Sequence, residues 1–179
     1  MKKIALIAIM AFFALGANAQ NVKFGHINTQ ELVYLTADSD SARVRLMAYQ
    51  KDLQEEMESM QTEYSNKLNT YQQKQASWTA AIRESKEAEL QEIIQRIQQF
   101  QQTAQQDLSQ LEANLYKPIF EKAQAAIAKI AKEKGLSFVF ETSTNPVVYY
   151  NEAQSVDILP LAKAAMGVPA EKVAPSQIQ

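Results

Sequence analysis

The chain has 179 residues, a formal net charge of −2 at pH 7, one histidine and no cysteine. Without cysteine there is no disulfide framework, and the single histidine, His26, leaves zinc without a credible set of ligands. A mildly acidic chain also lacks the basic face that a nucleic acid partner needs. Neither a glycine-rich phosphate loop nor a Gly-x-Ser-x-Gly motif occurs, so we expect neither an enzyme nor a bound cofactor.

The first 19 residues are typical of a cleavable signal peptide. Lys2 and Lys3 form a basic start, an apolar run follows over residues 4–16, and residues 17–19 supply the small-x-small pattern that signal peptidase recognises. The apolar run is shorter than the roughly 20 residues that span a membrane, although an uncleaved anchor is the alternative. We expect cleavage after Ala19 and a periplasmic mature chain, and the loss of two lysines leaves 16 basic and 20 acidic residues.

The segment after the signal peptide predicts a strand and a short helix. Residues 22–27 alternate apolar and polar side chains, which is typical of a strand. Asn28 or Thr29 is a suitable N-cap for a short helix that continues to Leu35. Residues 36–41 contain several further N-cap candidates, and we predict a loop there.

The next stretch, residues 41–116, contains neither glycine nor proline, and its apolar residues recur at alternating steps of three and four. This spacing places them on one narrow stripe, the pattern of a coiled-coil seam. Two arms of about 38 residues, each roughly 55–60 Å long, would pair as an antiparallel hairpin. We predict its tip between Gln75 and Ser85, with Ser77 or Thr79 as the N-cap of the returning helix.

Two groups of apolar residues in this hairpin have different expected roles. Residues on the stripe should form the seam between the two helices: Leu53, Leu68, Leu108 and Leu111. Soft or aromatic side chains are candidates for contact with a bound partner: Met57, Met60, Trp78 and Phe100. Phe100 stands off the stripe of Ile97 and Ala104, so we expect it to lie at least partly outside the seam.

The rest of the chain completes a small body. Pro118 should kink the returning helix, which then continues to a C-cap at Gly135. The elements predicted beyond this cap are strands at residues 136–141 and 147–150, a helix at residues 156–166 and a disordered tail at residues 168–179.

A body of three short strands is marginal on its own, because it buries little apolar area. Sharing the sheet between copies would also protect its strand edges. We therefore expect an oligomer in which residues 20–40 and 117–167 form an oligomerisation body and residues 41–116 form the arm. The strand residues expected at this interface are Phe24, Ile27, Phe138, Phe140, Val148 and Tyr150.

Six short segments carry a family resemblance: Val22–Asn28, Tyr116–Ile119, Ala126–Gly135, Phe138–Phe140, Val147–Tyr150 and Val156–Ile158. In this order they resemble the Skp (OmpH) family of periplasmic chaperones for outer-membrane proteins. The resemblance extends over residues 22–167, nearly the whole mature chain.

The resemblance implies an α+β, mainly α fold: a homotrimer in which the strands form a central barrel and three coiled-coil hairpins surround a cavity. Unfolded outer-membrane proteins would be held there without ATP, before delivery to the outer-membrane assembly machinery. The mature chain departs from better-known members in being mildly acidic rather than strongly basic, which argues against lipopolysaccharide or membrane-surface binding. The alternative is a structural coiled-coil adaptor or scaffold of the periplasm without chaperone activity.

Overall fold

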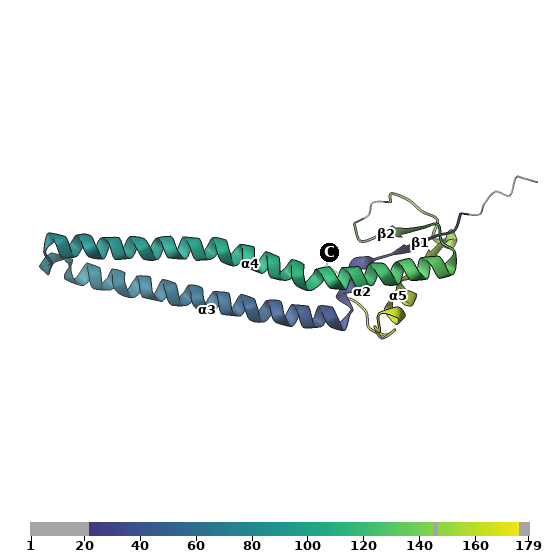
Figure 1. The fold of residues 1–179 in the computed structure, drawn as a ribbon, viewed down its shortest axis with the longest axis horizontal. Helices are drawn as coiled ribbons and strands as arrows, with labels where there is room; N and C mark the ends of the chain where they lie inside the picture. The colour runs from purple at the N-terminus through teal and green to yellow at the C-terminus, as the bar shows by residue number, and fades with distance from the viewer. Residues whose placement is uncertain (1–21, 145–146, 176–179) are drawn as a thin grey trace, which may run out of the picture.

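The computed structural model describes residues 22–144 and 147–175. It shows a long helical hairpin that projects from a small body of strands and helices (Figure 1), as the sequence predicts. The expected signal peptide lies outside the described residues. The elements are β1 (Phe24–Ile27), α2 (Thr29–Tyr34), α3 (Ala37–Lys74), η1 (Gln75–Ser77), α4 (Ala80–Lys134), β2 (Phe138–Glu141), η2 (Glu152–Gln154), β3 (Ser155–Asp157) and α5 (Leu159–Ala165).

Helices α3 and α4 lie side by side and antiparallel along the arm (Figure 1). α3 has 38 residues and α4 has 55, so α4 continues past the arm into the body. Two ion pairs mark the register of the helices: Arg96 with Glu63 at 3.2 Å in the arm, and Lys122 with Asp38 at 2.5 Å where the arm meets the body. Because the register is nearly the same at both places, the apolar stripes face each other along the arm.

Threonines cap both arm helices. The Thr36 hydroxyl accepts a hydrogen bond from the backbone N–H of Ser39 at 3.1 Å, and Thr79 accepts one from Ile82 at 3.4 Å. Thr79 is therefore confirmed as the N-cap after the tip. The loop predicted at residues 36–41 is wrong, because Thr36 satisfies a free N–H of the first turn and α3 begins directly at Ala37.

Pro118 lies inside α4 without ending the helix. Proline has no N–H, so the helical hydrogen bond from residue 118 to the carbonyl of Asn114 is missing. The direction of α4 changes as the helix passes from the arm into the body (Figure 1). α4 ends at Gly135, whose left-handed φ of +65° confirms it as the predicted C-cap.

Three short strands form a parallel sheet in the order β2-β1-β3. Phe24 pairs with Phe138 on one side of β1 and with Ser155 on the other. Gly25 and Ile27 are buried on the inner face of β1, whereas Phe24 and His26 alternate to the outer face and are half-buried. The core against this inner face consists of Ile27, Leu32, Val33, Ala42, Ile119, Ala123, Ile130, Ile158 and Ala162.

The third strand is not where the sequence predicts it. Residues 147–150 are not part of the sheet, and β3 lies instead within the segment predicted as the start of the terminal helix. Val148 is fully exposed, and the ring of Tyr150 lies 5.0 Å from the ring of His26. The assignment of Val148 and Tyr150 to an interface strand is therefore wrong.

The position of β3 depends on two local anchors that periodicity does not reveal. The Asn151 side chain caps the short helix η2 by accepting a hydrogen bond from the N–H of Ala153 at 3.0 Å. The side chain of Ile158 is fully buried, and its N–H donates to the carbonyl of His26 at 3.1 Å. These anchors place residues 155–157 beside β1, so that α5 begins only at Leu159.

The C-terminal segment differs from the predicted disordered tail. Gly167, with φ of +69°, turns the chain after α5, and the side chain of Val168 is only 5% exposed. In the segment that follows, the carbonyls of Ala170 and Lys172 accept hydrogen bonds from the Lys163 ammonium group. Residues 176–179 lie outside the described residues.

Gly25 marks a close approach between β1 and its neighbours. A Cβ at this position would lie 2.9 Å from Leu136 Cδ1 and 2.9 Å from the Val156 carbonyl oxygen. We predict that Gly25→Ala separates β1 from β3 and lowers the free energy of unfolding by about 1–3 kcal/mol. Denaturant unfolding at fixed chain concentration measures the change. Ser137→Ala, at an exposed position nearby, is the control, and unchanged stability of Gly25→Ala would contradict the close packing.

Candidate functional site

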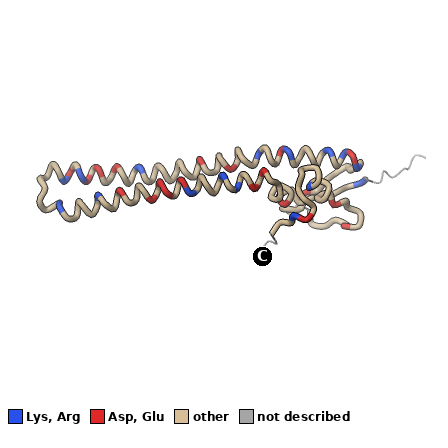
Figure 2. Tube along the Cα trace, turned by 90° about the horizontal axis from the view of Figure 1, so that it is seen from below, with Lys and Arg blue, Asp and Glu red and all other residues tan. Residues whose placement is uncertain are grey.

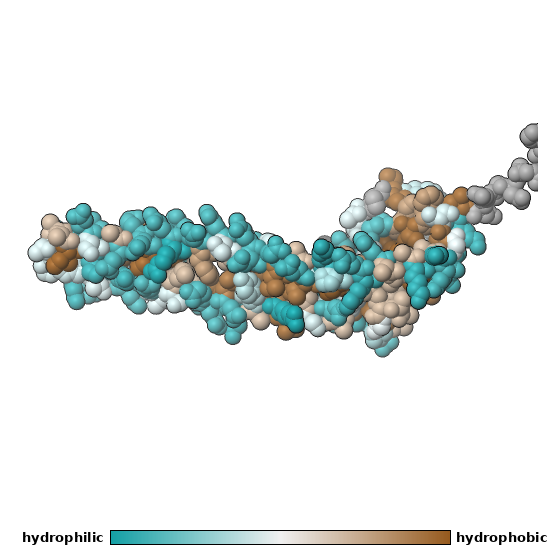
Figure 3. Space-filling view, in the orientation of Figure 1, coloured by the Kyte–Doolittle hydropathy of each residue, from teal (hydrophilic) through white to brown (hydrophobic). Residues whose placement is uncertain are grey.

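The arm surface is mostly polar, and apolar side chains show mainly along the seam between α3 and α4 and at the tip (Figure 3). Basic and acidic residues are interspersed along both helices (Figure 2). Residues 37–116 contain 8 Lys and Arg against 13 Asp and Glu, so the arm is net acidic. An apolar ligand would therefore meet the arm at its seam or tip.

A hollow of about 360 Å³ opens in the seam midway along the arm. Its apolar lining, shared by α3 and α4, consists of Leu53, Met57, Phe100, Ala104 and Leu108. The other four lining residues are Gln50, Gln54, Gln101 and Gln105. None of these residues is charged, and a glutamine amide both donates and accepts hydrogen bonds. This mid-arm hollow thus offers apolar contact together with neutral hydrogen bonding.

The mid-arm hollow brings together residues that were predicted to have separate roles. Met57 and Phe100, predicted as partner contacts, line it beside the predicted seam residues Leu53 and Leu108. Phe100 is half-buried, so it belongs to the edge of the seam rather than to a distinct outer surface. Three other residues that the sequence singled out lie elsewhere in the arm and are half-buried: Met60, Leu68 and Leu111.

Trp78 lies at a second hollow, of about 310 Å³, near the tip. Its indole packs edge-on against Tyr71, with the ring centroids 5.9 Å apart. Lys86 and then Lys67 hydrogen-bond to the Glu89 carboxylate and hold its pKa below its ordinary value. The remaining lining residues are Asn66, Thr70 and Leu90. With two lysines and one glutamate, this tip hollow differs from the uncharged mid-arm hollow.

Two apolar positions were missed in the sequence. Ile93 is 2% exposed, and its spacing of three from Leu90 is the signal that could have placed it in the seam. Ile82 is 43% exposed and belongs to residues 75–82, a run at the tip without any charged residue. The lack of charge in this run could have indicated an apolar tip.

The outer face of the sheet carries an aromatic cluster. The rings of Phe24 and Phe140 pack edge-to-face with centroids 5.8 Å apart, and Phe138 stacks on Phe140 at 6.4 Å. Phe138 is 59% exposed, whereas Ile27, also predicted at the interface, is buried in the core. An exposed aromatic cluster is typical of a surface that associates with another protein.

Among the described residues, every buried side-chain nitrogen and oxygen atom has a hydrogen-bond partner. His26 Nδ1 lies 2.8 Å from Ser155 Oγ and so links β1 to β3. Within residues 22–144 and 147–175, no group of three or more His, Cys, Asp or Glu side chains is placed to hold a metal ion. Across the same ranges, no helix combines the length and apolar character that crossing a membrane requires.

Leu68 is half-buried in the arm, and its replacement tests whether the arm opens independently. We predict that Leu68→Ala lowers the local stability of the arm by about 2 kcal/mol, because it removes packed methyl groups from the seam. Hydrogen exchange should become faster in the middle of α3 and α4 and stay unchanged in β1 and α5, which belong to a separate core. Asn69→Ala, at an exposed neighbouring position, should change neither. Equally faster exchange in the body would contradict independent opening.

Known proteins share this architecture. The family model described as outer membrane protein (OmpH-like) matches residues 23–166. No curated protein matches the chain significantly. Six chains of solved structures match. One of them is a candidate outer membrane chaperone (OmpH-like) from Caulobacter crescentus CB15, with a TM-score of 0.69 and 16% sequence identity. The match covers 81% of this chain and 83% of that chain. At such low identity this structure supports the fold alone. Because the family match includes both the arm and the body, the chain belongs to the OmpH-like family.

Proposed function

We propose that this chain is an ATP-independent periplasmic holdase, which binds unfolded outer-membrane proteins between its arms and prevents their aggregation before membrane insertion. The observation that carries the proposal is an arm whose seam opens into an apolar, uncharged hollow between glutamines. Membership of the OmpH-like family supports an outer-membrane chaperone in the periplasm in general terms. The Caulobacter protein of the same fold is described as a candidate outer membrane chaperone.

Weak and repeated contacts suit an unfolded client, which has no fixed shape. The mid-arm hollow is open and has the volume of a small ligand pocket, so it receives a few side chains rather than a folded surface. Met57 adapts to apolar groups of different shape. Contacts on several linked arms reinforce one another, because each later contact forms at a high effective concentration.

The charge of the arm favours apolar holding over electrostatic capture. With 13 acidic and 8 basic residues, the arm provides no general attraction for lipopolysaccharide or for an anionic membrane surface. Neither is therefore part of the proposed function. Salt should accordingly have little effect on client affinity.

The proposed oligomer is a homotrimer that shares the sheets of its three bodies. The aromatic cluster of Phe24, Phe138 and Phe140 supports this proposal, because it leaves apolar area exposed on a body with a small core. Association through this cluster would hold three arms on one side of the bodies, around a common cavity. Residues 20–40 and 117–167 would form this unit, and cleavage after Ala19 would release it into the periplasm. Delivery of clients to the outer-membrane assembly machinery completes the proposed role.

The oligomer predicts a specific response to charge at the aromatic cluster. The parental protein should have the mass of three chains in solution, and Phe138→Asp should dissociate it because a carboxylate would be buried at the interface. Val44→Asp is the matched control, since Val44 is an exposed apolar residue of the arm, 67% exposed. Light scattering measures the masses. A parental mass of one chain, or trimers in both variants, would contradict the proposed interface.

Client holding predicts a matching response at the mid-arm hollow. Stoichiometric protein should keep an unfolded β-barrel protein soluble without nucleotide, whereas Phe100→Ser and Met57→Ser should weaken client affinity, each by on the order of tenfold. Gln99→Ser, exposed on the adjacent position of α4, should bind as the parental protein does. Aggregation followed by light scattering, with titration of a fluorescent client, provides both measurements. Failure of the parental protein to prevent aggregation would favour the adaptor alternative.

A further inference from the structure

Residues 167–175, which we call the C-terminal brace, connect α5 to the start of α3. The Lys163 side chain of α5 is buried, and its ammonium group donates hydrogen bonds to the carbonyls of Ala170 at 2.7 Å and Lys172 at 2.6 Å. A buried ammonium group is tolerated only when its donors are satisfied. Lys163 therefore determines the path of the brace across the body.

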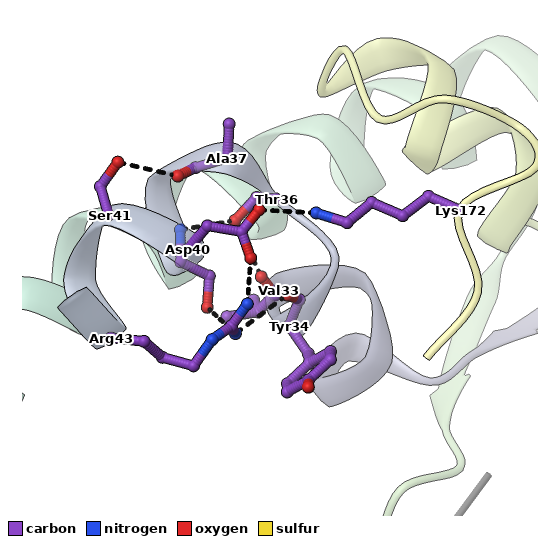
Figure 4. A network of polar contacts seen from close by, with 9 residues as sticks. Val33, Tyr34, Thr36, Ala37, Asp40, Ser41, Arg43 and Lys172 are labelled. Carbon is purple, nitrogen blue, oxygen red and sulfur yellow. Dashed lines mark hydrogen bonds and ion pairs between the residues drawn. The ribbon is translucent and has the colours of Figure 1, made fainter. Parts of the chain in front are cut away.

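The brace then reaches the arm through an ion pair (Figure 4). Lys172 Nζ lies 2.7 Å from Asp40 Oδ2 in the first turn of α3, and Arg43 contacts the other carboxylate oxygen. The hydrogen bond from Lys172, followed by the charges of Lys172 and Arg43, holds the pKa of Asp40 below its ordinary value. Arg43 also donates to the carbonyl of Tyr34 at 3.2 Å, and its guanidinium group lies 4.3 Å from the centre of the Tyr34 ring. Asp40 is thus bound directly by the brace, and Arg43 links it to the end of α2.

This contact lies at the junction between arm and body, where Ser39 and Ala42 in the first turns of α3 are buried. Besides these packing contacts, two stretches of backbone cross the junction: α4, which lacks one hydrogen bond at Pro118, and the short link at residues 35–36 between α2 and α3. The Asp38–Lys122 ion pair places both segments at the same level of the hairpin. A rotation of the arm would therefore bend the molecule at this level, directly beside Asp40.

We propose that the C-terminal brace sets the angle of the arm, and that the Lys172–Asp40 ion pair is the point at which it releases. The two side chains are 36% and 47% exposed, and an ion pair so close to solvent is weak enough to open reversibly. The effect at the tip is large, because a rotation of about 5° moves the end of an arm about 57 Å long by about 5 Å. That a change of this angle alters the width of a client cavity rests on the proposed function, whereas the angle of the arm itself does not.

The angle can be measured because the chain has no native cysteine. Ser59→Cys in α3 and Ser137→Cys in the body provide two exposed sites for spin labels. The labelled full-length mature chain is mixed with an excess of unlabelled chain, so that each particle contains one labelled copy. Pulsed dipolar spectroscopy without client then reports the distribution of distances between arm and body.

Lys172→Gln should broaden this distance distribution by a few ångströms, and Lys172→Arg, which keeps the ion pair, should preserve it. Lys132→Gln, a matched loss of charge at an exposed lysine of α4, should also preserve it. High salt should broaden the parental distribution and leave that of Lys172→Gln unchanged, because salt screens an exposed ion pair.

Hydrogen exchange in the first turns of α3 gives a second readout and should become faster in Lys172→Gln alone. Equal distributions and exchange rates in all variants, or equal broadening in Lys132→Gln, would overturn the proposal, whether or not the protein holds clients.

Discussion

Helix α4 packs its apolar stripe against α3 in the arm and, beyond Pro118, against α2, α5 and the sheet in the body. This single helix therefore supplies half of the seam and much of the core. The two parts have different stability, because the arm buries a narrow stripe whereas the body encloses residues such as Ile119 and Ala123 from several sides. An arm that opens locally while the body stays folded is a direct consequence.

The hairpin and the caps that begin and end its helices could be predicted from the sequence because they depend on local signals. A stripe of regular spacing, the N-cap at Thr79 and the left-handed C-cap at Gly135 all act within a few residues. The third strand could not be predicted, because the pairing of three residues with β1 goes together with the burial of Ile158 in the core, which is not a local signal. The brace escaped prediction for the same reason, since Lys172 and Asp40 are brought together by the fold and not by sequence spacing.

The candidate site shows the same limit of prediction. Periodicity predicts which residues belong to the apolar stripe, whereas the mid-arm hollow is lined by residues of both helices. Phe100 illustrates this, because it stands off the stripe in the sequence and yet lines the hollow beside Leu53 and Leu108. A hollow between two partners is a property of their pairing, and neither helix alone contains the information to predict it.

The parallel pairing of β1 with β2 constrains the order in which the molecule can fold. Phe24 pairs with Phe138, so the entire arm lies between two neighbouring strands. β1 precedes the hairpin in the chain, so it stays unpaired until the hairpin has formed and folded back to bring β2 beside it. Closing a chain segment of this length is slow unless the local helices form first. The body is therefore completed last, and a truncated chain that ends before β2 cannot form the aromatic cluster of Phe24, Phe138 and Phe140.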